Sequence, residues 1–226
     1  ATTTRSGFTR PLLWNPATGE RIDFDLPDLG GEIMALDWSP DGQSLLFCQI
    51  DRAAQQLYRL DVATGRAARI AHAPGTYYNP FAAASFFGPD GAIYALWENS
   101  TQPPQLVELG ADGTAARVLL RAGDAPPGRA FRSVTFASSD GTQVQAWLAT
   151  PPGAGPFPTV VEMHGGPHFA VTDTFNPIAQ AWLDQGFAFC SINFRGSTTF
   201  GRAFKEQIWG DVGHWEVEDV VAGRAW

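Results

Sequence analysis

The chain has 226 residues, of which 44% are hydrophobic and 17% charged, a composition typical of a globular protein with a hydrophobic core. Its 24 glycines and 17 prolines are spread along the sequence, which favours many tight turns over a disordered tail. The net charge of −8 argues against nucleic acid and anionic membrane surfaces as partners, because both select basic patches.

A turn motif recurs in the first half of the chain. Three copies close at Gly19, Gly65 and Gly113, which are 46 and 48 residues apart. A second motif, Pro-Asp-Gly, closes at Gly42 and Gly91, which are 49 residues apart. Proline presets the backbone angle of a turn, and the Asp-Gly or Thr-Gly pair supplies the positive φ that reverses a strand. Two interleaved motifs with one period indicate a structural repeat.

Apolar runs flank these turns and predict about four strands per repeat. The runs are Ser44–Ile50, Gln56–Leu60, Ala92–Trp97 and Gln105–Leu109. This pattern is typical of a β-propeller blade, and a β-sandwich with similar turns is the alternative. Only two blades and a fragment fit before residue 125, whereas a propeller has about four to eight blades. We therefore expect further blades outside this sequence.

The period changes after the segment Ala125–Gly128, which is predicted to be a linker. A hairpin is predicted next, with Phe131–Phe136 and Val144–Leu148 on either side of Ser139-Asp140-Gly141. Two buried strands and three helical segments then alternate. They are, in chain order, Pro158–Met163, Asn176–Gln185, Phe187–Phe194, Phe200–Trp209 and His214–Trp226. Strands that alternate with helices indicate a mostly parallel sheet with helices on its faces.

The most specific motif, His164-Gly165-Gly166-Pro167, directly follows the first of these strands. In α/β hydrolases the loop after the third strand carries such glycines, so that a backbone N–H faces the developing oxyanion. Glycine is required because a side chain would occupy the space of the substrate carbonyl. One such donor lowers the barrier by about 3 kcal/mol. An ordinary turn with two glycines is the alternative.

Three stretches resemble the prolyl oligopeptidase family of serine peptidases, most closely its acylaminoacyl-peptidase branch, in their order and spacing. They are Val160–His168, Asn193–Gly201 and Gly213–Val220. A propeller before the hydrolase segment is also the domain order of that family. The resemblance implies that residues 1–127 are C-terminal blades of a β-propeller. Residues 128–226 are then the N-terminal part of an α/β-hydrolase peptidase domain, ending before the nucleophile elbow.

The resemblance also assigns site residues. Gly166, and less surely Gly165, would offer a backbone amide to the oxyanion. His164 would hold this loop, and it is not the triad histidine of the family, which lies near the C-terminus of the domain. Arg195 is expected to bind substrate, and its place at the end of a strand would let it order the neighbouring loop through fork-like hydrogen bonds. For His164 and His168, a purely structural role is favoured over any chemistry.

The last predicted helix has an apolar and an acidic side. The apolar side carries Val217, Val220 and Val221. The acidic residues lie largely on the opposite side of the helix and are Glu216, Glu218 and Asp219. We expect these acids on a solvated face rather than as an acid/base pair. The resemblance places this helix beside the strand that bears the nucleophile.

No serine of the chain fits the G-x-S-x-G turn that exposes a nucleophile. Ser197 follows Gly196, but the residue two positions before it is Arg195. The family order serine, aspartate, histidine puts all three beyond this point, so the chain alone is expected to be inactive. Its expected partners are a short peptide substrate and the missing C-terminal part of the hydrolase domain, for which a second chain is one possible source; a homo-oligomer is left open.

The leading hypothesis is a serine peptidase that hydrolyses short peptides, of the aminopeptidase or acylaminoacyl-peptidase type. A carboxylesterase, which shares the glycine loop, and a non-catalytic propeller with a degenerate hydrolase domain are the alternatives. No metal or organic cofactor is indicated, because there is no His/Cys cluster at ligand spacing and no dinucleotide motif. Cys48 and Cys190 lie in apolar runs and are expected to be buried free thiols, which fits a cytoplasmic location.

Overall fold

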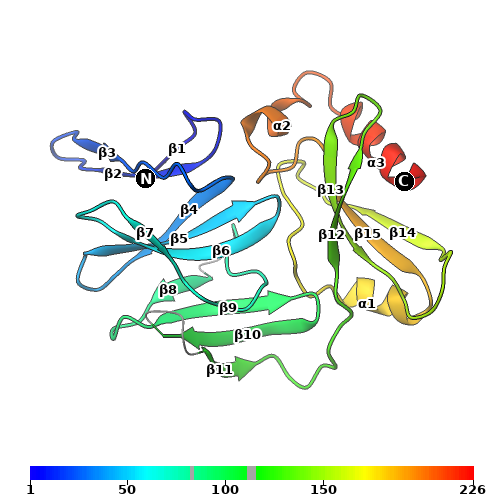
Figure 1. Ribbon diagram of the computed structural model, residues 1–226, viewed down its shortest axis with the longest axis horizontal. Helices are drawn as coiled ribbons and strands as arrows, with labels where there is room; N and C mark the ends of the chain where they lie inside the picture. Colours follow the sequence, from blue (N-terminus) through cyan, green and yellow to red (C-terminus); the bar gives the residue numbers. More distant parts are fainter. Residues whose placement is uncertain (82–83, 111–115) are drawn as a thin grey trace.

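A computed structural model describes residues 1–81, 84–110 and 116–226. Three antiparallel sheets lie one after another on one side of the molecule, and a fourth sheet with helices lies on the other side (Figure 1). The first sheet has three strands and each of the others has four. Each of the first three sheets is built from strands that are consecutive in the sequence and joined by hairpins. The three sheets also follow one another in space in the order in which they occur in the sequence.

The first two sheets contain strands β1 to β7. The first is built from β1 (Thr2–Thr3), β2 (Arg10–Trp14) and β3 (Arg21–Asp23). The second is built from β4 (Glu32–Trp38), β5 (Ser44–Asp51), β6 (Ala54–Asp61) and β7 (Ala67–Arg69). Within each of these two sheets, every strand pairs with the next along the chain. The turns that close at Gly19 and Gly65 occupy the same place in both sheets, between the last two strands, and both glycines have positive φ.

The third sheet repeats this arrangement. Its strands are β8 (Ser85–Phe87), β9 (Ile93–Asn99), β10 (Gln102–Leu109) and β11 (Ala116–Arg121). The turns at Gly42 and Gly91 each lie between the first two strands of a sheet, with φ of 70° and 81°. The third copy of the first motif, at residues 111–113, lies outside the described residues. The repeat predicted from the turns is thus confirmed as successive four-stranded sheets.

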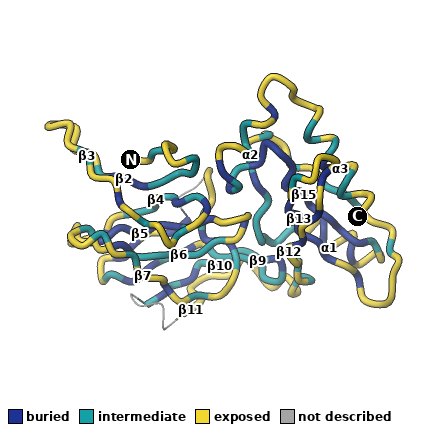
Figure 2. Tube along the Cα trace, turned by 45° about the horizontal axis from the view of Figure 1, so that its top comes forward, coloured by how far each residue is buried: buried dark blue, intermediate teal, exposed yellow. Residues whose placement is uncertain are grey.

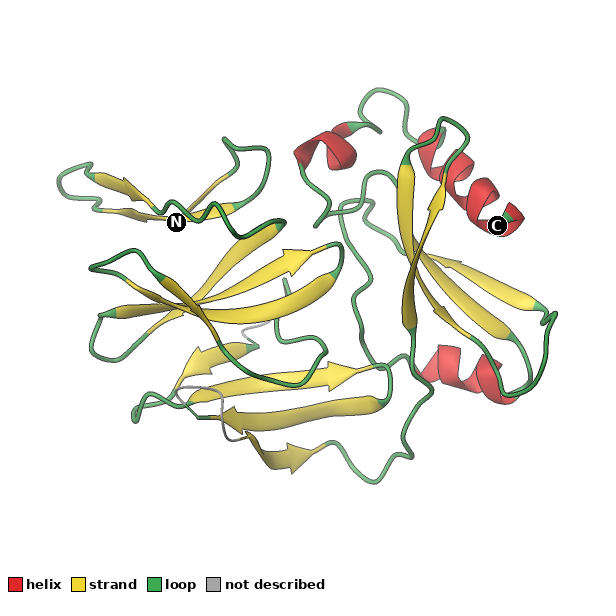
Figure 3. Cartoon of the chain, viewed as in Figure 1, coloured by secondary structure: helices red, strands yellow, loops and turns green. Residues whose placement is uncertain are grey.

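The core of this half lies between the second and third sheets. Leu46 and Leu57 of the second sheet pack in one buried cluster with Ile93 and Leu109 of the third. The first strands of the second and third sheets, β4 and β8, are neighbours, and β2 of the first sheet lies beside β4, so the three sheets lie side by side (Figure 3). This geometry confirms part of a β-propeller, in which each blade buries a face against the next.

The fourth sheet is mixed, with strand order β12-β13-β15-β14. Its strands are β12 (Arg132–Ala137), β13 (Gln143–Ala149), β14 (Thr159–Met163) and β15 (Ala188–Asn193). Only the pair β14 and β15 is parallel. The expectation of a mostly parallel sheet is therefore wrong for the described residues, because β12 and β13 form a hairpin and β13 then pairs antiparallel with β15. The predicted hairpin around Ser139-Asp140-Gly141 is confirmed.

Helices cover both faces of this sheet. Helix α1 (Pro177–Asp184) buries Ala179 and Leu183 against Phe189 on one face, and α3 (Trp215–Ala225) packs Val220 and Ala222 on the other. The Asn176 side chain caps α1 by accepting hydrogen bonds from the backbone N–H groups of residues 178 and 179. Burial is concentrated in β5 and in the central strands β13 and β15 (Figure 2).

Two predicted helices differ from the structure. Helix α2 covers only Arg202–Glu206, because Gly201 before it has a φ of 90° and Gly210 after it a φ of 82°. In α3, Asp219 is fully buried, whereas Val217 and Val221 are 53% and 55% exposed. The expected solvated face for Asp219 is thus wrong: the helix turns this carboxylate, not those valines, into the protein.

Both cysteines are buried and unpaired, as expected. Among the described residues, no helix has the length and apolar character needed to cross a membrane.

We expect the chain 1–226 to self-associate through β14. Within the described residues this strand pairs only with β15, and Met163 at its end is 59% exposed. An open, apolar strand edge is a template for pairing with another chain. Sedimentation velocity should show concentration-dependent association, which Met163→Lys should reduce by placing a charge on that edge. A monomeric wild-type chain with a sharp cooperative melt would contradict this expectation.

Candidate active site

The glycine loop, residues 164–167, lies at the carboxyl end of β14, where it meets α3. It lines an open hollow of about 380 Å³ together with Met163, Phe194, Glu216 and Val217; we call this the loop hollow. Gly165 and Gly166 are exposed. Gly166 has a φ of 133°, and a Cβ there would lie 3.0 Å from the backbone nitrogen of His168. A Cβ on Gly165 would meet nothing within 4 Å, so its free side faces open space.

His164 anchors the loop as a neutral ring. Its Nδ1 lies 3.0 Å from the Gly165 carbonyl oxygen and its Nε2 lies 2.8 Å from Ser197 Oγ. A carbonyl only accepts, so Nδ1 carries the proton, and Nε2 accepts from the Ser197 hydroxyl. The ring also stacks on Phe194, with centroids 4.4 Å apart. Burial lowers the pKa of His164, and the hydrogen bond to Gly165 and the charge of Glu162 only partly oppose this shift.

His168 anchors the other end of the loop. Its Nδ1 lies 2.9 Å from the Gly196 carbonyl oxygen and donates to it, while its Nε2 accepts from the Trp209 indole N–H at 3.4 Å. The turn at residues 195–197 therefore contacts the histidines on both sides of the glycines. The sequence motif predicted His164 as a support of the loop but gave no signal for Ser197 as its partner.

Arg195 is fully buried behind this turn. Its guanidinium donates to Asp219 on α3, with Nη2 2.6 Å from Oδ1, and to Asp140 in the β12–β13 turn, with Nη1 2.6 Å from Oδ2. The Trp215 ring lies against it, 4.1 Å from the guanidinium carbon. Burial lowers the pKa of Arg195, but Asp219 and then Asp140 outweigh this effect, and its net pKa is raised.

Asp219 is satisfied by several donors at once. Its Oδ2 accepts from the Arg195 backbone N–H at 2.7 Å, and its Oδ1 accepts from the Ser138 hydroxyl at 2.6 Å. Arg195 lines neither the loop hollow nor the second cavity described below. Its ordering of the neighbouring turn agrees with the expected fork-like hydrogen bonds, and the expected contact with substrate stays a prediction.

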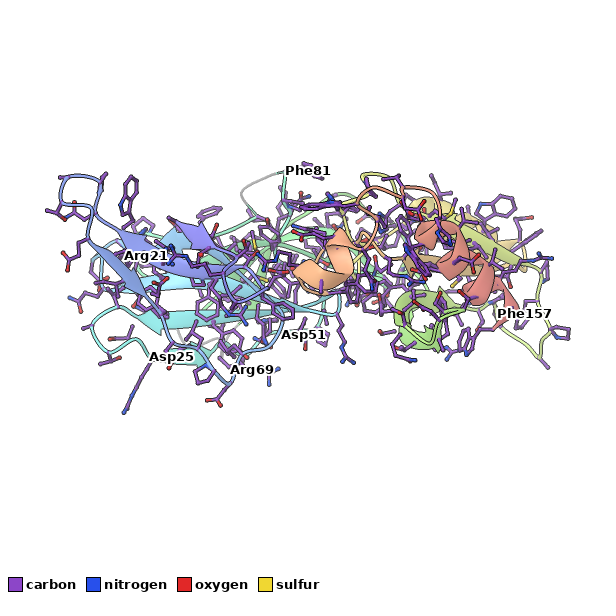
Figure 4. All side chains as sticks on the ribbon, turned by 90° about the horizontal axis from the view of Figure 1, so that it is seen from above. Arg21, Asp25, Asp51, Arg69, Phe81 and Phe157 are labelled. Carbon is purple, nitrogen blue, oxygen red and sulfur yellow. The ribbon has the colours of Figure 1, made fainter. Side chains whose placement is uncertain are left out.

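A second cavity, of about 310 Å³, lies between the propeller sheets and the segment after the glycine loop; we call it the junction cavity. It is lined by apolar side chains, several threonines and the charged residues Glu32, Glu98 and Lys205. Phe81 of the propeller half stacks on Phe169 at 6.1 Å, and Figure 4 shows Phe81 at the junction of the two halves. His168 and Phe169 connect this cavity to the glycine loop.

Carboxylates hold the two halves together beside this cavity. Asp173 accepts a hydrogen bond from the Ser100 backbone N–H, and Glu98 accepts one from the Phe175 backbone N–H, both at 2.9 Å. Burial raises the pKa of Glu98, and the hydrogen bond from Phe175 opposes this shift. The segment that leaves the glycine loop is therefore tied to the propeller half at its far end.

Radial antiparallel sheets followed by a strand, a glycine loop and helices on both faces of a mixed sheet define a propeller joined to an α/β-hydrolase fold. The sequence model of the prolyl oligopeptidase family matches residues 173–226. This match confirms the resemblance to the prolyl oligopeptidase family that the sequence motifs indicate.

Curated relatives include members of the acylaminoacyl branch. The acylamino-acid-releasing enzyme of Rattus norvegicus is 27% identical over 201 residues, which is 81% of this chain and 27% of that enzyme. Dipeptidyl-peptidase 5 of Trichophyton schoenleinii is 27% identical over 205 residues, covering 83% of this chain and 27% of that protein.

Among solved structures, a Mycobacterium tuberculosis puromycin-hydrolyzing peptidase has the same fold, with a TM-score of 0.82 at 18% identity. The match covers 99% of this chain and 36% of that one. The chain thus spans about a quarter of the length of these curated relatives and about a third of this solved structure.

We expect the folded state to lose stability as the pH falls below about 6.5, the ordinary pKa of histidine. His164 has a lowered pKa in the fold, so the unfolded chain takes up its proton at a higher pH than the folded one. Its contribution is complete above the unfolded pKa and is lost as the pH falls toward the folded pKa. Urea unfolding at about pH 7.5 and about pH 5, with Met163→Lys present in every protein to reduce self-association, measures this loss.

The control for this prediction is His164→Phe, which keeps a ring against Phe194 but cannot titrate. Its unfolding free energy should depend less steeply on pH than that of the wild type. Some dependence should remain, because burial also lowers the pKa of His72. An unchanged slope in His164→Phe would contradict the neutral, buried state of this ring.

Proposed function

We propose that this chain is part of a serine peptidase that hydrolyses short peptides, of the aminopeptidase or acylaminoacyl-peptidase type. In this proposal residues 1–127 are propeller blades and residues 128–226 are the N-terminal part of the hydrolase domain. Gly166 supplies the backbone amide that stabilises the oxyanion, and Gly165 is the second candidate for this role. The nucleophile, acid and base come from sequence outside these 226 residues.

The observation that carries the proposal is the open space beside the glycine loop. The loop follows the edge strand β14, whose residues are half-buried or exposed rather than buried as expected, its free side faces the loop hollow, and a Cβ on Gly165 would project into that space. Backbone N–H groups at such a place are the donors that hydrolases use for a developing oxyanion. Peptide hydrolysis is supported by the relatives, which include acylamino-acid-releasing and dipeptidyl-peptidase enzymes.

Ser197 and His164 form a serine–histidine hydrogen bond, yet they are not a nucleophile and base in this proposal. Ser197 is fully buried, so a substrate carbonyl cannot reach its hydroxyl. The other ring nitrogen of His164 faces the Gly165 carbonyl and not a carboxylate that would stabilise a charged ring. Lowering of its pKa by burial also makes it a poor proton acceptor.

The junction cavity supports the restriction to short substrates. Its volume of about 310 Å³ is at the lower end of small-ligand sites, and it is bounded by the propeller half on one side. A peptide of a few residues fits such a space, whereas a folded protein does not. The apolar and aromatic lining favours substrates with apolar side chains next to the scissile bond.

The test is hydrolysis by the natural full-length protein. We expect a peptide p-nitroanilide to be cleaved with a higher kcat/KM than a p-nitrophenyl ester without a peptide part. Cleavage of the ester alone would favour a carboxylesterase, and no cleavage of either, with a fully folded protein, would favour a non-catalytic scaffold.

Gly165→Ala tests the role of the loop in the same assay. The new methyl meets no atom within 4 Å, so the melting temperature should not change, while crowding of the oxyanion position should lower kcat/KM by about 10²–10³. Gly91→Ala is a matched control, because its Cβ also enters open space but lies in a propeller turn; there a loss of stability from its positive φ is expected without loss of kcat. Full activity of Gly165→Ala would contradict the assignment.

A further inference from the structure

We propose that Ser197 is a positioning residue that sets the direction of the Gly166 N–H through His164. This inference rests on the proposed function, since it assigns a task to a residue outside the expected catalytic set. It concerns a relay of two hydrogen bonds, from the Ser197 hydroxyl to His164 Nε2 and from His164 Nδ1 to the Gly165 carbonyl.

The relay fixes a peptide plane. The Gly165 carbonyl and the Gly166 N–H belong to one peptide unit, which is planar and trans, so the two groups point in opposite directions. When His164 holds the carbonyl oxygen at 3.0 Å, the Gly166 N–H must point away from the ring. Two adjacent glycines have few steric restraints of their own, and this peptide plane therefore needs an external hydrogen bond to stay in place.

The histidine ring is held on its other side as well. It stacks on Phe194 with an interplanar angle of 18°, which restrains the ring plane but leaves it free to make a half-turn about the Cβ–Cγ bond. The hydrogen bond from Ser197 at 2.8 Å removes that freedom. The Gly165 carbonyl, which can only accept, selects the tautomer with the proton on Nδ1, and this tautomer leaves Nε2 free to accept from the Ser197 hydroxyl.

Ser197 itself sits in a rigid turn. Its backbone N–H donates to the Phe194 carbonyl at 3.0 Å, and the side chain is fully buried. The preceding Gly196 has a φ of 102°, and a Cβ there would lie 2.7 Å from Ile208. Arg195, at the start of the turn, is bound to Asp219 through both its backbone and its side chain. The hydroxyl is thus presented to His164 by a turn with little freedom to move.

The experiment uses the full-length protein and a peptide p-nitroanilide. Ser197→Ala should lower kcat about tenfold, the size of one lost positioning hydrogen bond, and leave KM unchanged. A peptidyl aldehyde, which forms a tetrahedral adduct, should bind about tenfold more weakly, whereas the matching peptidyl alcohol should bind as before. Ser197→Thr, which keeps the hydroxyl, should restore kcat.

Ser191→Ala is the matched control. Ser191 is equally buried and its hydroxyl donates to the Glu162 carboxylate at 2.5 Å, but its side chain forms no hydrogen bond with residues 164–167 among the described residues. Loss of this hydroxyl should lower the melting temperature as much as Ser197→Ala does and leave kcat unchanged. An equal loss of kcat in both variants would show a general structural effect and overturn the proposal.

If Ser197→Ala is poorly folded, a double-mutant cycle with His164 tests whether the two residues act through one relay. His164→Phe keeps the stacked ring and breaks the relay, so it should lower kcat and aldehyde binding at least as far as Ser197→Ala. The double variant should lose no more than His164→Phe alone, because both changes break one relay. Additive losses, or a fully active His164→Phe, would overturn the proposal. An inactive wild type would instead refute the proposed function.

Discussion

The arrangement of the site depends on one buried ion pair, between Arg195 at the end of β15 and Asp219 on α3. A charge without a partner is very costly inside a protein, so each of these groups requires the other to be in place. Their hydrogen bonds join the side chains, and a further bond joins the Asp219 carboxylate to the Arg195 backbone. This combination fixes the position of α3 and the path of the chain beyond β15 at the same time.

This ion pair also positions the glycine loop, through a chain of hydrogen bonds. Arg195 begins the turn whose next two residues bind His164 and His168, and these histidines enclose the two glycines. The same region faces the propeller half, where Thr199 accepts a hydrogen bond from the Ala53 backbone N–H at 3.1 Å. The ion pair, the loop and the domain junction therefore form one connected unit, and its members are distant in sequence.

The blades and the glycine loop could be predicted from the sequence, because short turn and loop motifs specify them. The buried contacts behind the loop could not. The turns at Gly42 and Gly65 require positive φ, and the sequence shows this directly. The burial of Asp219 could not be predicted, because helical periodicity groups it with Glu216 and Glu218. Its ion-pair partner Arg195 lies 24 residues away in the sequence. Ser197 gave no signal for the same reason, since its partner is 33 residues away. The antiparallel pairing of β13 with β15 also depends on tertiary contacts that no local pattern reports.

The most direct test is equilibrium urea unfolding of Asp219→Ala, followed by tryptophan fluorescence and compared with the parent chain, both in the Met163→Lys background. Removing one partner of a buried ion pair should cost about 3–5 kcal/mol of unfolding free energy, and the fluorescence of Trp215, which lies on the guanidinium, should change in the folded state. A loss below about 1 kcal/mol, as is typical of exposed pairs, would contradict the view that this ion pair organises the site.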